Sequence, residues 1–402
     1  MFKFSVIAMC LLGACATDGK DGAPGADGTN GTNGTNGTNG TDGTNGTNGS
    51  NGSTGPAGPE LAPPGVYTLA NAAAGNQVAA YLRGEDGDLT RDNEFATGGA
   101  GFGVGLHSQD GITFNKASQR FFAVNAGDNT ISMLAIDSDG VLTQLATIAS
   151  GGTRPISVAA HGDAVYVLNY GNTATPAAVD GNITGFKVVG DTLVAIAGST
   201  QALSAATDVN PTDLAFTPDG SALVVAELAT NKLDTFAVTA DVAAAGNFQA
   251  SSGAKPFSMA FSPEGFMIVS EVGDGTATGS TASSYAVSAA GALTAITKQL
   301  ATGQGAGCWV VTVGGFAYIA DSATATITGL TVSTTGVLSA PTATATGPGP
   351  LDLAVSPDRG YLYSLASGDH TIRIFDINSD GSLTAKPTLS GMAQFASGLV
   401  AR

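Results

Sequence analysis

The sequence predicts an all-β fold, a seven-bladed β-propeller built from four-stranded antiparallel blades. The first observation is a repeating unit: a short apolar run, a turn of the Pro-Asp-Gly type and a second apolar run, seen best in Pro211–Thr235. The unit recurs closely in Pro256–Glu271 and Pro350–Ala366, and loosely in Thr113–Asn125 and Val158–Asn169. Short strands separated by turn residues at this pitch are typical of antiparallel meanders.

The second observation is a regular series of turns of the Gly-x-Leu type, each followed by a strand. Their leucines lie 53, 51, 100, 45 and 45 residues apart, at Leu89, Leu142, Leu193, Leu293, Leu338 and Leu383. The double interval indicates one unit that has lost its turn, with Val238–Phe248 in the corresponding place. Seven units of about four strands each predict seven blades.

The third observation concerns the two ends of the array. Val66–Asn71 opens with the pattern of a second strand, so the first unit lacks its innermost strand. Gln394–Val400 matches the missing strand and has no continuation. We therefore expect the C-terminal strand to complete the first blade, which removes an exposed sheet edge.

Before the propeller, which we expect to span residues 61–402, the chain reads as a targeting segment. Residues 1–14 have the apolar core and small final residues of a secretory signal peptide. Leu12–Cys15 resembles the lipobox of bacterial lipoproteins, which implies cleavage before Cys15 and lipidation of that residue within a short N-terminus, residues 15–18. Ala16 follows the cysteine, and by that family's sorting pattern it implies the outer membrane or the cell surface of a bacterium. The alternative is an ordinary signal peptide.

A low-complexity segment, residues 19–60, joins the two parts. Glycine stands at every third position from Gly19 to Gly58, which is the collagen-like Gly-X-Y signature. Proline is scarce in it, so we expect a disordered stalk rather than a stable triple helix. The protein is then a monomer, or a trimer joined through the stalk.

Charge and cysteine content exclude several classes of function. The 15 Lys and Arg against 32 Asp and Glu give a net charge of −17, which argues against nucleic-acid partners. It also argues against binding to anionic lipid headgroups, which leaves the lipid anchor as the contact with a membrane. Only three cysteines occur, and only Cys308 lies in the propeller, so no disulfide framework exists there.

Four stretches of the array resemble the seven-bladed lactonase-like propellers, a group that includes 6-phosphogluconolactonase-like proteins and fungal carboxymuconate cyclases. They are Phe122–Ile131, Gly151–Val158, Pro211–Phe236 and Gly307–Val311, and they occur in the expected order. The resemblance implies a lactonase-type hydrolase. Cyclase members are associated with a histidine near basic residues, and none of this chain's three histidines stands in such a match, so a cyclase is not indicated.

Propeller topology brings the loops before the inner strands and the loops after the second strands to one face. These loops supply the predicted catalytic residues Glu227, Glu271, Arg154, Lys255 and His107. They also supply the predicted substrate-binding residues Asn125, Asn169, Trp309 and Tyr170.

Three explanations of the acidic and amide residues stay open. Glu227, Glu271, Asp321, Asn125 and Asn169 stand at matching repeat positions, and converging oxygens of this kind suit Ca²⁺, the one cofactor suggested. Alternatively, one of the two glutamates acts as a general base on water, with Arg154 or Lys255 stabilising the oxyanion. The third explanation is that these residues end their strands and bond to loop backbone.

Two functions follow. The first is a lactonase of the bacterial cell envelope that hydrolyses a sugar lactone or related cyclic ester at the channel mouth. The second is a surface-binding module without catalysis, recognising a glycan, a peptide or an envelope protein. Exposed aromatic side chains at the mouth would favour the binding module, with Trp309 and Tyr170 as the candidates.

Overall fold

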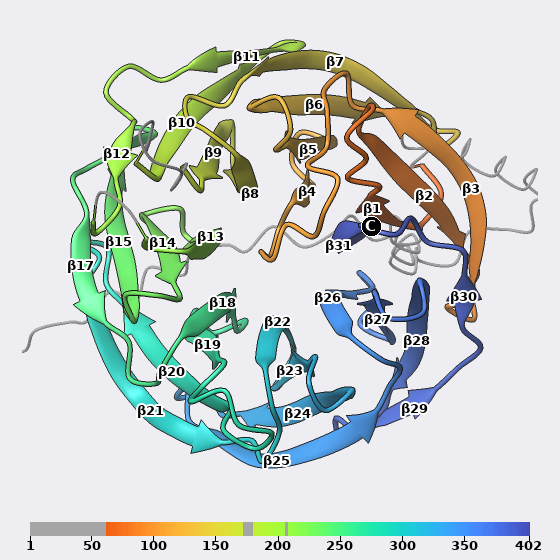
Figure 1. Ribbon diagram of the computed structural model, residues 1–402, viewed down its shortest axis with the longest axis vertical. Coiled ribbons are helices and arrows are strands. Elements are labelled where there is room, and N and C mark those ends of the chain that lie inside the picture. Colours follow the sequence, from red (N-terminus) through yellow and green to blue (C-terminus); the bar gives the residue numbers. More distant parts are fainter. Residues whose placement is uncertain (1–61, 172–179, 206–207) are drawn as a thin grey trace, which may run out of the picture. The chain divides into compact units, whose positions relative to one another are not determined.

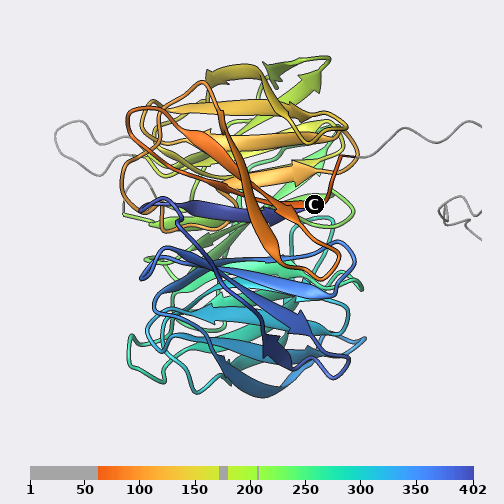
Figure 2. The same cartoon turned by 90° about the vertical axis from the view of Figure 1, so that its right-hand side faces the viewer.

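The computed structural model describes residues 62–171, 180–205 and 208–402. These residues form seven antiparallel sheets set around a common centre like the blades of a propeller (Figures 1 and 2). The predicted all-β, seven-bladed fold is confirmed. No helix among these residues is long and apolar enough to cross a membrane. Cys15 and the Gly-X-Y segment lie outside the described residues, so the lipid anchor and the stalk remain predictions.

Each blade has four strand positions, from the centre of the ring outward. The inner strands are β31 (Ser397–Ala401), β4 (Ile112–Asn115), β8 (Pro155–His161), β13 (Pro211–Phe216), β18 (Pro256–Phe261), β22 (Gly307–Val313) and β26 (Pro350–Val355). The second strands are β1 (Gly65–Leu69), β5 (Arg120–Asn125), β9 (Ala164–Asn169), β14 (Ala222–Glu227), β19 (Met267–Glu271), β23 (Phe316–Asp321) and β27 (Tyr361–Ala366).

The third and outer positions complete the blades. The third strands are β2 (Gln77–Arg83), β6 (Thr130–Ile136), β10 (Asn182–Val189), β15 (Lys232–Thr239), β20 (Thr281–Val287), β24 (Thr326–Val332) and β28 (Thr371–Ile377). Four outer strands are continuous: β3 (Leu89–Ala96), β7 (Leu142–Ala149), β21 (Leu293–Ala301) and β25 (Leu338–Ala345). Three are split: β11 and β12 (Thr192–Ala195, Gln201–Ala202), β16 and β17 (Val242–Ala243, Asn247–Ala250), and β29 and β30 (Leu383–Ala385, Leu389–Ser390).

The C-terminal strand closes the ring, as the sequence predicts. β31 pairs antiparallel with β1, and its partners run from Val66 opposite Ala401 to Leu69 opposite Ser397. The Thr68 hydroxyl also donates to the carbonyl of Gly398 at 2.6 Å. The first and last parts of the described chain therefore share one sheet, the closing blade of β31 and β1–β3.

The Gly-x-Leu turns are the joints between neighbouring blades. Gly87 adopts φ +83°, and a Cβ placed on it would lie 2.3 Å from the Tyr361 ring. Gly381 adopts φ +82° and meets Phe316 in the same way. The carbonyls of these two turns accept hydrogen bonds from Tyr363 at 3.0 Å and Tyr318 at 2.9 Å, respectively. Glycine is required because the turn needs a left-handed residue that also packs directly on the next sheet.

The blade of β13–β17 has no Gly-x-Leu turn, and a different turn makes its contact with the neighbouring blade. Ala240 and Asp241 make its turn, both with positive φ (49° and 67°). The Tyr166 hydroxyl of the neighbouring blade donates to the Asp241 carbonyl and accepts from the Ala243 amide, each at 2.8 Å. The contact between the two blades is therefore kept although the glycine is lost.

Candidate functional site

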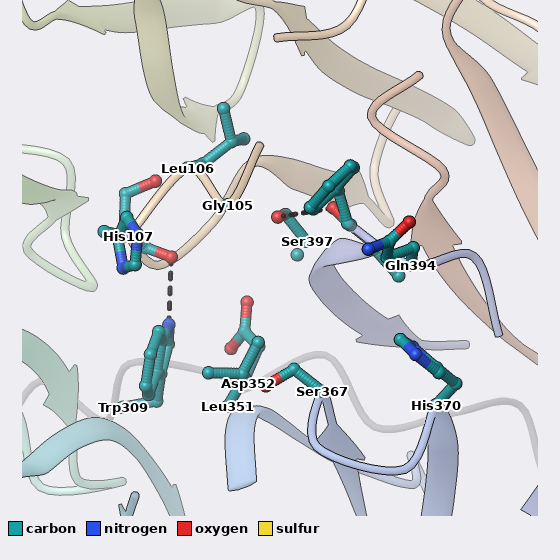
Figure 3. A pocket seen from close by; sticks show the side chains of 14 residues that line it. Gly105, Leu106, His107, Trp309, Leu351, Asp352, Ser367, His370, Gln394 and Ser397 are labelled. Atoms are coloured by element: carbon teal, nitrogen blue, oxygen red, sulfur yellow. Dashed lines mark hydrogen bonds between the residues drawn. The ribbon is translucent and has the colours of Figure 1, made fainter. Parts of the chain in front are cut away.

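A cavity of about 310 Å³ opens beside the inner strands where the closing blade meets the blade of β26–β30. Five chain segments line it: Gly105–Ser108, Trp309 of β22, Leu351 and Asp352 of β26, Ser367 with His370, and Gln394–Gly398. Figure 3 shows the Asp352 carboxyl pointing into the cavity, with His107 and Trp309 on one side and His370 and Gln394 on the other. The site is assembled from parts of the chain that only ring closure brings together.

The segment Thr97–Gly111, which we call the crossing loop, runs from β3 into the middle of the ring before β4 begins (Figure 1). Its Gln109 side chain accepts a hydrogen bond from the Val310 amide at 3.0 Å and donates to the Met259 carbonyl at 3.4 Å. Its Ser108 hydroxyl donates to the Ile156 carbonyl at 2.7 Å. These bonds tie the loop to three inner strands and fix the part of it that lines the cavity.

Asp352 is the buried acid of the cavity, with only 2% of its surface exposed. Its carboxyl oxygens accept hydrogen bonds from the amides of Leu353 at 2.9 Å and Leu399 at 3.2 Å. Burial, and then the charge of nearby Asp110, raise the pKa of Asp352 well above its ordinary value, while these hydrogen bonds lower it. The net direction is upward, so the group favours its neutral, protonated form.

His370 stands one residue before β28, where Asn129 and Asn231 stand before β6 and β15. Each asparagine side-chain oxygen accepts a backbone amide from the next blade, of Arg154 or of Lys255, at 2.7 Å. His370 shares their left-handed backbone, with φ of 55°, but its Nδ1 is buried and has no hydrogen-bond partner. The sequence pattern suggests a purely structural residue here, whereas the structure turns this histidine to the cavity.

His107 and Trp309, two of the residues predicted from the sequence, line the same cavity. Trp309 Nε1 donates to the Ser108 carbonyl at 2.9 Å, next to His107, and its ring packs edge-on against Phe257. Trp309 is only 5% exposed, so it is part of the wall and not the exposed aromatic platform expected of a binding module. His107 is exposed.

The predicted ring of carboxylates and amides does form a series of equivalent positions, at the ends of five different second strands. All five side chains are fully buried, and none lines the cavity. Glu271 accepts the Gly253 amide at 2.8 Å, Asp321 accepts the Thr328 hydroxyl at 2.7 Å, and Asn169 donates to the Ser150 carbonyl at 3.2 Å. Asn125 donates to Ser132 and accepts from Thr97, both at 2.8 Å, and Glu227 accepts the Ser204 amide at 2.9 Å.

The donor set does not fit a common Ca²⁺ site. Each of the five side chains is hydrogen-bonded to its own separate partner, and no partner is common to two of them. Across the residues that the structure describes, no three His, Cys, Asp or Glu side chains gather so that they could hold a metal ion. Burial raises the pKa of Glu271 and brings that of Asp321 to about 7, so Asp321 is a poorer ligand for a hard cation at neutral pH.

One blade departs from the shared hydrogen-bond pattern. Where Thr328 donates to Asp321, β15 carries Asp234 close to Glu227, and both carboxyl oxygens of Asp234 are buried without a hydrogen-bond partner. Burial, and then the contact with Glu227, raise the pKa of Asp234 to about 9. Asp234 therefore keeps its proton at neutral pH.

Replacing Asp234 by Thr, the residue type of the Asp321 blade, is expected to stabilise the protein. An unfolded Asp releases its proton near pH 3.8, while the folded group keeps it to about pH 9, so Asp234 lowers the free energy of unfolding as pH rises between these values. The variant should gain about 1–3 kcal/mol near pH 7, and less at pH 4. Urea unfolding at pH 7 and at pH 4 measures the free energy of unfolding of the variant and of the wild type. Thr328→Asp, which places an Asp beside Asp321, is the reverse substitution in the other blade. A gain that does not change with pH would contradict the raised pKa of Asp234.

Arg154, Tyr170 and Lys255 do not line the cavity. The Arg154 guanidinium stacks on the Tyr170 ring with its centre 4.2 Å from the ring centroid. The Lys255 amide is the one capped by Asn231. Cys308, beside Trp309, is buried, and burial raises the pKa of its thiol to about 12, so thiolate chemistry has no support there. The oxyanion donors expected from Arg154 or Lys255 are therefore not in this cavity.

The structure also adds cavity residues that the sequence reasoning did not assign to the site, notably Asp352, His370, Ser367 and Gln394. Asp352 is the third residue of the inner strand β26, next to the loop that enters this strand, and His107 lies in the corresponding loop before β4. Gln394 belongs to the closing segment, and only the ring closure could have pointed to it.

Comparison with known proteins agrees with the fold. The family model described as "Lactonase, 7-bladed beta-propeller" matches residues 104–390. No curated protein sequence matches the chain. Among solved structures, the periplasmic gluconolactonase PpgL of Pseudomonas aeruginosa is 19% identical, with a TM-score of 0.60 over 84% of this chain and 99% of that one.

Two further structures show the same likeness. A candidate 6-phosphogluconolactonase from Bacteroides fragilis is 18% identical, with a TM-score of 0.61 over 84% of this chain and 98% of that one. A candidate 6-phosphogluconolactonase from Bacteroides uniformis is 17% identical, with a TM-score of 0.63 over 83% of this chain and 99% of that one. At these identities the likeness shows the shared fold.

Proposed function

The chain belongs to the seven-bladed lactonase β-propeller family, and we propose that it hydrolyses a sugar lactone or a related cyclic ester in the cavity between Asp352 and His370. One observation carries the proposal. A buried acid with a raised pKa, Asp352, and a partly exposed histidine, His370, line the same 310 Å³ cavity. Titratable groups held in different environments around one cavity are typical of acid–base sites.

In the proposed reaction His370 takes a proton from a water molecule, which attacks the lactone carbonyl carbon. Asp352, in its neutral form, donates a hydrogen bond to the carbonyl oxygen as negative charge develops there. The intermediate collapses by breaking the bond to the ring oxygen, and the protonated His370 returns the proton to that oxygen. The balance is one lactone and one water giving one hydroxy acid. His107 stands on the opposite wall and is available to bind substrate hydroxyls.

His370 is the stronger candidate base of the two cavity histidines. It is only partly exposed and its Nδ1 lacks a partner, whereas His107 is exposed to solvent. A proton-accepting nitrogen shielded from bulk water interacts more strongly with a bound water or substrate. The names of the structural neighbours suggest the first substrates to test, glucono-1,5-lactone and its 6-phosphate.

Two replacements of Asp352 test its role as a hydrogen-bond donor. Asp352→Leu removes the donor and should lower kcat by about 10²-fold. Asp352→Asn keeps a neutral donor at every pH, so hydrolysis should persist and lose the decline that the wild type shows as pH rises through the raised pKa of Asp352. Proton release at constant pH measures both rates. Equal turnover of Asp352→Leu and the wild type would refute this role.

A further inference from the structure

Arg154 sits between two aromatic rings and does not line the cavity. It is the last residue before β8, and its backbone is fixed in the left-handed region with φ of 58°. The centre of its guanidinium lies 4.3 Å from the Phe102 ring centroid and 4.2 Å from that of Tyr170. Phe102 comes from the crossing loop and Tyr170 follows β9, so two separate elements hold the group.

The guanidinium is left without an anionic partner. Across residues 62–171, 180–205 and 208–402 it forms no ion pair and donates no hydrogen bond, and its Nε is buried without a partner. Arg83, Arg120 and Arg373, in contrast, pair with Asp358, Asp191 and Asp369, respectively. Acidic residues outnumber basic ones by 32 to 15 in this chain, so an unpaired arginine is not explained by a shortage of acids.

Beside these ring contacts, the N–H groups at the edge of the guanidinium have no partner among the described residues. The two rings desolvate its flat faces and hold it in one orientation, and burial lowers the pKa of Arg154 from its ordinary value. A buried charged donor without a partner is unfavourable, and an anion at the edge removes that cost. The planar fork of N–H groups matches the two oxygens of a carboxylate or a phosphate.

We propose that Arg154, Phe102 and Tyr170 form a binding site for the carboxylate or phosphate group of a small ligand. None of the three lines the cavity, so the proposal goes beyond lactone hydrolysis and does not depend on it. The net charge of −17 disfavours anion binding by the protein as a whole. At this site the positive charge and fixed orientation of Arg154 outweigh that repulsion.

Thermal unfolding of the full chain in increasing inorganic phosphate, or acetate, at constant ionic strength tests the proposal. A ligand of the folded state raises the unfolding midpoint by mass action, and we expect a saturable rise of about 2–4 °C. Arg154→Met should lose this rise. Lys255→Met is the matched control, because Lys255 precedes β18 in the same left-handed conformation (φ 57°) and has the same Asn-capped amide, without two stacked rings. It should keep the rise.

A second variant keeps the test valid if Arg154→Met fails to fold. Arg154→Lys retains the charge without the planar fork, and phosphate should bind it at least about 10-fold more weakly. A rise with phosphate alone would assign the site to phosphate groups, and a rise with acetate alone to carboxylates. No rise in the wild type, or an equal rise in Arg154→Met, would overturn the proposal.

Discussion

His370→Asn is expected to lower kcat for lactone hydrolysis by about 10²–10⁴-fold, the usual contribution of a general base. The fold should tolerate the change, because Asn129 and Asn231 occupy the same position in other blades with φ of 61° and 57° against 55° for His370. Asparagine adopts this left-handed conformation readily. The variant removes the proton acceptor and replaces it with the residue that the repeat pattern favours.

Initial rates of proton release and thermal unfolding, measured on the same preparations, separate chemistry from stability. His161→Asn is the control, because His161 lies at the turn between β8 and β9, packs on Phe216 and does not line the cavity. It should leave kcat within about twofold of the wild type, as expected for a residue outside the site. An unchanged kcat in His370→Asn would remove this histidine from the mechanism.

Trp309→Ala is expected to cost about 3–5 kcal/mol of unfolding free energy, the range for truncating a buried aromatic residue. Trp309 is 5% exposed, packs against Phe257 and donates its Nε1 proton to the Ser108 carbonyl. Its loss leaves a void next to the crossing loop and frees the carbonyl beside His107. Chemical denaturation of the full chain measures the change.

Trp309→Phe separates packing from the hydrogen bond. It keeps an aromatic ring against Phe257 and loses only the donor to Ser108, so it should cost about 1–2 kcal/mol. Its effect on KM should exceed its effect on kcat, because the loop that it anchors carries His107 and not the proposed base. Equal stability of Trp309→Ala and the wild type would contradict the view that this side chain holds the crossing loop in the ring.

The sequence was sufficient for the fold because each blade carries its own local signals. The Pro-Asp-Gly turns, the apolar second strands and the Gly-x-Leu turns recur at the pitch of one blade, and the structure shows why. Gly87 and Gly381, for example, must both adopt positive φ and lie directly against Tyr361 and Phe316. Val66–Asn71 has the pattern of a second strand and Gln394–Val400 that of the missing inner strand, which predicts the observed pairing of β1 with β31. Because such turns and strands recur along the chain, the sequence predicts the fold.

The candidate site is harder to predict from the sequence, because it depends on residues that differ between blades. A comparison of the repeats identifies only the residues that the blades share. The repeat predicts Glu227, Glu271 and Asp321 as site residues because they occupy one repeat position, but a shared position in a ring places the side chains in different blades. At His370 the repeat predicts a structural residue, because asparagines stand at this position before β6 and β15. The structure shows that the exception faces the cavity, while Asn129 and Asn231 cap neighbouring strands. A residue that departs from the repeat pattern, such as His370, therefore indicates the cavity better than a residue that follows it.

Lactone hydrolysis in the cavity between Asp352 and His370 can be measured as the rate of ring opening. Full-chain protein is mixed with glucono-1,5-lactone or its 6-phosphate at a slightly acidic pH, where spontaneous opening is slow, and proton release is recorded against substrate concentration. We predict a saturable rate, proportional to protein and reduced at least about 10²-fold in His370→Asn. A rate equal to that of buffer for every lactone tested, or one that His370→Asn retains in full, would contradict it.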